Sequence, residues 1–196
     1  MKKLLAAAFM IVILWQLTAG NDEVTLGPGI KAPDVPVQQV LNTSDSFQLN
    51  AVTITPLAEF RLTAKILAKE KYYFGDESNI SPVDLALGWG EMSDESVLES
   101  IEISQSGRWY RWYVNDFPIA RRAIETQSAN MHMIPADSGI EARIDNAKRG
   151  QLIQLQGYLV RADGPDNWYW QSSMTRSDTG NGACELVYVT HFDIIK

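Results

Sequence analysis

A single cysteine and a histidine are the residues whose chemistry could support covalent catalysis. Cys184 follows a glycine-rich loop, where a thiol can be exposed beside backbone N–H groups that stabilise an oxyanion. His132 could act as the general base, with Asn130 or Asp178 orienting its ring. This set predicts a cysteine-dependent hydrolase or transferase, although the sequence carries no signature of a known cysteine hydrolase.

The same residues also fit a structural role. A lone cysteine in a globular domain is commonly a buried small apolar residue, and a lone histidine is commonly hydrogen-bonded inside the fold. The neighbours Gly182, Ala183 and Leu186 are small or apolar. We therefore expect Cys184 to be structural, and we favour a protein that is not an enzyme.

Two aromatic runs form a second candidate site, for binding instead of catalysis. They contribute Trp109, Trp112, Trp168 and Trp170, and Arg176 follows the second run. Adjacent residues of a strand point to opposite faces, so each run places some rings outside the core. Exposed aromatic rings beside arginine are good binding platforms, here for a glycan or a peptide. The alternative is that one face is core and helices cover the other.

Metal and cofactor motifs are weak in this sequence. His132, His191 and the lone cysteine fall short of a zinc pattern. Residues 178–182 resemble part of a calcium loop but lack the later carboxylate, so they predict a turn. The glycine-rich motifs for phosphates and dinucleotides are also missing. We expect no metal and no cofactor.

The charge of the chain limits its partners. The 196 residues carry a formal charge of −7. Without Lys2 and Lys3 of the leader, 15 basic residues oppose 24 acidic ones, which gives −9. General nucleic-acid binding needs a basic surface, so we expect no nucleic-acid partner. An envelope protein, a peptide or a glycan remains as the expected partner.

The N-terminus predicts export. Lys2 and Lys3 precede an apolar run that ends at Leu17, and small residues follow. The run is shorter than the roughly 20 residues of a typical membrane span. Residues 1–20 are therefore predicted to be a signal peptide or an uncleaved N-terminal membrane anchor. We expect the protein in the periplasm or on the outer face of the inner membrane.

Beyond the leader, proline content and hydrophobic periodicity divide the chain. Residues 21–50 contain three prolines and few aromatics, which predicts an extended linker, and 51–196 form a single globular β-rich domain. Strands are predicted at 58–67, 128–135, 152–160, 168–170 and 186–194, with a hairpin at 101–114. Helices are predicted to start at Ser81 and to cover 118–127 and 138–148. The predicted fold class is α+β, an antiparallel sheet or small β-barrel with short helices between hairpins.

Three segments carry a resemblance to other proteins: SPVDLALGWG, SANMHMIP and GACELVYV. Together they resemble an uncharacterised family of exported or membrane-anchored bacterial proteins, which implies no catalytic residue here. The strand from Leu152 and the turn before it also resemble small barrels such as the oligonucleotide/oligosaccharide-binding fold. The sequence thus predicts an exported envelope domain that binds a partner or ligand without catalysis.

Overall fold

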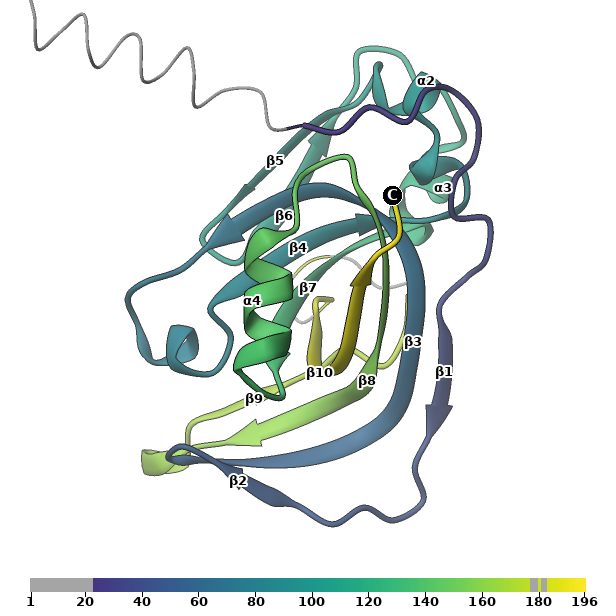
Figure 1. Cartoon of the computed structure of the whole chain (residues 1–196). Coiled ribbons are helices and arrows are strands. Elements are labelled where there is room, and N and C mark those ends of the chain that lie inside the picture. Colours follow the sequence, from purple (N-terminus) through teal and green to yellow (C-terminus); the bar gives the residue numbers. More distant parts are fainter. Residues whose placement is uncertain (1–22, 177–179, 181–182) are drawn as a thin grey trace, which may run out of the picture.

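The computed structural model describes residues 23–176, 180 and 183–196, so the predicted leader and Asp178 lie outside the described residues. Within them the fold is α+β, with a mostly antiparallel eight-stranded sheet, a separate two-stranded hairpin and short helices (Figure 1). This confirms the predicted fold class. The strands are β1 Val37–Val40, β2 Phe47–Leu49, β3 Val52–Lys71, β4 Val83–Gly88, β5 Glu102–Ser106, β6 Trp109–Tyr113, β7 Ser128–Pro135, β8 Leu152–Asp163, β9 Tyr169–Gln171 and β10 Glu185–Ile194. The α-helices are α2 Glu95–Leu98, α3 Arg121–Thr126 and α4 Ser138–Asn146.

The main sheet nearly closes on itself because β3 is long and has two neighbours. Its residues 53–65 pair with β8, and residues 65–71 pair with β4. The order β3, β4, β7, β10 and β8 then leads back to β3, so these five strands form a near-closed ring. The β7–β10 pair is parallel, and the other pairs in the ring are antiparallel.

Close packing of the ring requires a glycine in β8. Gly157 pairs with Phe60 on one side and Val189 on the other. A Cβ atom at this position would overlap the backbone oxygen of Tyr188. The glycine therefore allows β8 and β10 to approach each other, as close backbone contact in a sheet demands.

The core lies inside the ring and under α4. Alternate side chains of each strand point inward, and Ile140 and Ile144 of α4 pack with them. Asp137 caps the helix by accepting hydrogen bonds from the backbone N–H groups of Gly139 and Ile140. The predicted helix at 138–148 is confirmed, and it ends at Asn146.

The predicted helix start at Ser81 is wrong, because this segment begins β4. Every residue of β4 is buried, so the strand lacks the alternation that marks a half-exposed strand. Pro82 precedes the first residue of β4, where its missing N–H does not interrupt the pairing. Asp84, which the pattern placed in a first helical turn, instead lies in the sheet opposite His132.

The described part of the segment predicted as a linker, residues 23–50, packs against the sheet. β1 pairs with β3 through Val37–Val40, and β2 pairs with the start of β3. Ala32 is fully buried, and the Leu26 N–H donates to the Glu95 carboxylate. Residues 23–50 therefore belong to the folded domain and do not form a free tether.

The β5–β6 hairpin confirms the hairpin predicted at 101–114. Its two-residue turn, Gly107 and Arg108, has positive φ at both positions, as a type I′ turn requires. The side chains of Ile103, Tyr110 and Trp112 pack in the apolar cluster around Ala86, so the hairpin covers the outer face of the ring. In the part of the chain that the structure describes, no helix has the length and apolar character to cross a membrane.

Candidate functional site

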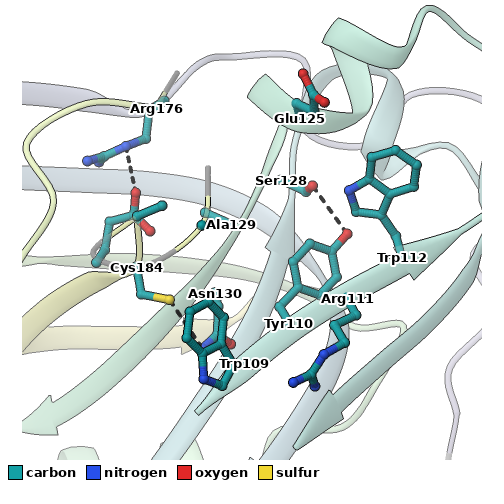
Figure 2. A pocket seen from close by; sticks show the side chains of 13 residues that line it. Trp109, Tyr110, Arg111, Trp112, Glu125, Ser128, Ala129, Asn130, Arg176 and Cys184 are labelled. Carbon is teal, nitrogen blue, oxygen red and sulfur yellow. Dashed lines mark hydrogen bonds and ion pairs between the residues drawn. The ribbon is translucent and has the colours of Figure 1, made fainter. Parts of the chain in front are cut away.

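The strongest candidate site is a pocket of about 410 Å³ beside the hairpin (Figure 2). We call it the β6 pocket. It brings together five of the sequence-predicted site residues: Trp109, Trp112, Asn130, Arg176 and Cys184. Its other lining residues are Tyr110, Arg111, Glu125, Ser128, Ala129, Gly180, Ala183 and Glu185.

One wall of the β6 pocket is aromatic and comes from β6. Trp109 is 39% exposed, whereas Trp112 is half-buried and packs edge-on against Phe117. The hydroxyl group of Tyr110 lies 3.2 Å from the Ser128 Oγ atom. Burial raises the pKa of Tyr110 to about 12, so its hydroxyl stays neutral and keeps its donor proton.

The opposite wall carries a fixed charge pair. The Arg176 Nε atom lies 2.7 Å from Oε1 of Glu185, whose side chain is 1% exposed. Arg176 also donates a hydrogen bond from Nη2 to the Ser173 carbonyl oxygen. Figure 2 shows the Cys184 sulfur directed towards Asn130 beside the Trp109 ring, whereas the Arg176 guanidinium is directed away from the β6 rings and pairs with Glu185. A buried ion pair with additional hydrogen bonds holds its guanidinium in one orientation.

Cys184 lines the β6 pocket and is half-buried. Its Sγ atom is 3.9 Å from Nδ2 of Asn130 and 4.0 Å from the carbonyl oxygen of Arg108. Asn130 is fixed in turn, because its Oδ1 accepts from Gln105 and its Nδ2 donates to the Arg108 carbonyl. The Asn130 amide donates to the sulfur, and the thiol donates to the Arg108 carbonyl oxygen; both are weak hydrogen bonds.

His132 lies outside the pocket, in a buried cluster under the hairpin turn. Its Nδ1 atom is 2.9 Å from Oδ1 of Asp84, and its ring centroid is 4.5 Å from that of Trp170. Arg108 reaches the same carboxylate oxygen at 2.6 Å and stacks 3.7 Å above the Tyr72 ring. His132 is 3% exposed and does not line the β6 pocket. The structure thus places Asn130 with Cys184, and His132 with Asp84.

Trp168 and Trp170 do not join the aromatic wall of the β6 pocket. Trp168 lines a different pocket of about 560 Å³, between the β2–β3 turn and the β8–β9 turn. Trp170 covers His132 and lies 5.5 Å from the Arg108 guanidinium. Of the four tryptophans proposed from the two runs, only Trp109 and Trp112 share a pocket.

Three charged residues of this region were not predicted from the sequence: Asp84, Arg108 and Glu185. Asp84 lies in an apolar run and Glu185 precedes one, at positions where an unpaired charge is costly. A charged residue within or beside an apolar run was therefore the sequence feature that could have identified both carboxylates as members of buried ion pairs. Arg108 adds a second signal, since it follows a glycine at a hairpin turn and adopts a φ of 69°.

The β6 pocket contains side chains that are suited to binding a ligand, in addition to the Cys184 thiol. Aromatic faces supply apolar and cation–π surface, and Asn130, Ser128 and two arginines supply hydrogen bonds. Among the described residues, no group of three His, Cys, Asp or Glu side chains could hold a metal ion. Asp178, the second candidate for orienting His132, lies outside the described residues.

Comparisons with protein-family models, with curated proteins and with solved structures found no match for this chain. The resemblance to exported bacterial proteins therefore stays a prediction, and the function is argued from the site alone.

Proposed function

We propose that this protein is an exported cell-envelope domain that binds a ligand or partner in the β6 pocket without catalysis. The observation that carries the proposal is that an exposed aromatic ring, Trp109, and a rigidly held arginine, Arg176, line the same cavity. Pockets that combine apolar walls with a few oriented polar groups are typical of binding sites.

The ring topology adds a fold-level argument, by analogy. Five strands with one parallel pair resemble the oligonucleotide/oligosaccharide-binding fold, which binds ligands on the face of its second and third strands. Counted along the ring, β4 and β7 hold those positions, and the β6 pocket lies over β7. The acidic charge of the chain disfavours a nucleic acid, so a peptide or glycan fits better.

The alternative is a cysteine-dependent hydrolase or transferase that uses Cys184 and His132. This alternative is supported by the position of Cys184, which lines the pocket, where a substrate would reach it. Against it, His132 is directed to the Asp84 carboxylate and covered by Trp170. A general base must come within hydrogen-bond reach of the proton that it removes. The geometry therefore supports binding better than catalysis.

The experiment is a screen of peptide and glycan panels against the full-length chain and two variants. Trp109→Ala removes the exposed ring of the pocket and should weaken the best ligand by about 10-fold or more, since such rings dominate binding energy. Tyr169→Ala is the matched control, because Tyr169 is 60% exposed but lies outside the β6 pocket. It should leave the affinity unchanged. Ligands that bind all three proteins equally would contradict the proposal.

A further inference from the structure

The β5–β6 hairpin offers a strand edge that faces the β6 pocket. β5 lies on the β3 side of the hairpin, whereas β6 lies beside β7 and lines the pocket. The edge of β6 that does not pair with β5 therefore lies on the side of the hairpin that carries the β6 pocket. The hairpin is a two-stranded sheet of its own that lies against the main sheet (Figure 1).

The register of the hairpin identifies the backbone groups on that edge. In an antiparallel hairpin, the two residues that flank a two-residue turn form two backbone hydrogen bonds with each other. Further along the strands, hydrogen-bonded pairs alternate with pairs that are not hydrogen-bonded. Trp109, Arg111 and Tyr113 thus bond to β5, and the N–H and C=O groups of Tyr110 and Trp112 point away from it. Among the described residues, neither Tyr110 nor Trp112 makes a further backbone hydrogen bond. Unpaired strand edges are templates for another strand.

The charges around the pocket identify what the added strand should carry. Glu125 is paired with Arg121, and Glu185 is paired with Arg176. Within the described part of the chain, Arg111 is the charged lining residue without an ion-pair partner. It is exposed and lies on the same face of β6 as Trp109. A carboxylate on a neighbouring strand would come within reach of Arg111, since cross-strand side chains lie roughly 5 Å apart.

We propose that the occupant of the β6 pocket is an extended peptide with an acidic side chain, which pairs as an added strand with the free edge of β6. The backbone groups of Tyr110 and Trp112 would bond the peptide main chain, and Arg111 would bind its carboxylate. This mode gives affinity through main-chain hydrogen bonds and specificity through alternate side chains. The inference rests on the proposed function and names the ligand class of the same pocket.

The test uses a random library of linear eight-residue peptides selected on the full-length chain. The strongest peptide is resynthesised in two forms, with N-methyl groups on alternate amides of one edge or of the other. N-methylation removes donors and blocks strand pairing without changing a side chain. One form should lose binding by about 10-fold or more, and the other should bind as before, because a paired strand uses a single edge. Equal effects of both forms would overturn the proposal.

Hydrogen exchange locates the contact, and Arg111 variants test the charge. Exchange of the Tyr110 and Trp112 amides should slow when the peptide binds, whereas the Arg111 amide, already bonded to β5, should change little. Arg111→Ala should weaken an acidic peptide by several-fold, and Arg111→Lys should restore part of the affinity. A library without binders, or binding that leaves both amides unprotected, overturns the inference. A glycan that depends on Trp109 while no peptide binds overturns it too, but leaves the proposed function standing.

Discussion

The Nη1 atom of Arg108 lies 2.6 Å from Oδ1 of Asp84, and this ion pair fixes the hairpin turn to the first strand pair of the ring. Asp84 is fully buried, and His132 approaches the same oxygen from β7. Arg108 also bonds the Ser81 carbonyl oxygen and stacks on Tyr72. The position of β6, and with it the shape of the β6 pocket, therefore depends on one buried charge cluster.

Removal of the Asp84 carboxylate should destabilise the protein strongly. Asp84→Ala leaves Arg108 without its counter-charge in a buried site, which costs about 3 to 5 kcal/mol of unfolding free energy. Asp163→Ala is the matched control, because Asp163 pairs with Arg161 at 2.7 Å on the exposed surface. It should leave the urea midpoint near that of the wild type. Equal midpoints for the two variants would contradict the role given to Arg108 and Asp84.

The tyrosine next to Ser128 should make stability fall at high pH. The pKa of Tyr110 is raised to about 12 by burial, while an unfolded tyrosine ionises near 10. The neutral Tyr110 hydroxyl contributes its full stabilisation below pH 10. This contribution is lost as the pH rises towards 12, because Tyr110 of the unfolded chain releases its hydroxyl proton at a lower pH than Tyr110 of the folded protein. The unfolding free energy falls by about 2 kcal/mol over this pH range. Tyr110→Phe should reduce this fall but not abolish it, because burial also raises the pKa of Tyr72 to about 12, and Ser128→Ala should retain the fall. A profile unchanged by Tyr110→Phe would contradict the burial of that hydroxyl.

Gly157 should be intolerant of substitution, in contrast to a glycine at the hairpin turn. Gly157→Ala forces a methyl group against the backbone of Tyr188, and we expect a loss above about 3 kcal/mol because backbone cannot easily yield. Gly107→Ala meets open space and should cost only about 1 kcal/mol for its positive φ. Similar losses in thermal or urea unfolding would mean that β8 and β10 are not in close contact.

Cys184 should behave as a structural residue. In the native protein, its reaction with iodoacetamide should be slow, and His132→Ala should not change the rate, because His132 is held by Asp84. Cys184→Ser should cost roughly 1 kcal/mol of stability from the added polarity. Fast labelling that falls when His132 is replaced would support the enzyme alternative instead.

Local patterns were sufficient to predict the elements that have one exposed face. The alternation at 101–114 predicted the hairpin, and the helical pattern at 138–148 predicted α4. The strand at 152–160 was also correct, although β8 continues to Asp163. In each case the side-chain period, or a capping residue within four positions, determines the local structure.

Features that depend on distant partners were not predictable from local pattern. β4 has no exposed face, so its sequence lacks the alternation of apolar and polar residues that identifies a strand. Ser81 and Pro82 before it match the residue pattern of a helix N-terminus. The two tryptophan runs look alike in sequence, yet the register of β8 and β9 sends Trp168 to another pocket. The pairing of Arg108 with Asp84 joins residues 24 positions apart, and neither side chain identifies the other in advance.

Fluorine NMR of protein labelled with 5-fluorotryptophan tests the central claim, that the β6 pocket is the binding site. The signals of the native tryptophans report on separate places: Trp109 and Trp112 in the β6 pocket, Trp168 in the other pocket, and fully buried Trp89 in the core. Titration with the strongest peptide or glycan from the screens should shift the Trp109 and Trp112 signals and leave those of Trp168 and Trp89 in place. Shifts confined to Trp168, or a saturating ligand that leaves Trp109 and Trp112 unmoved, would contradict the account.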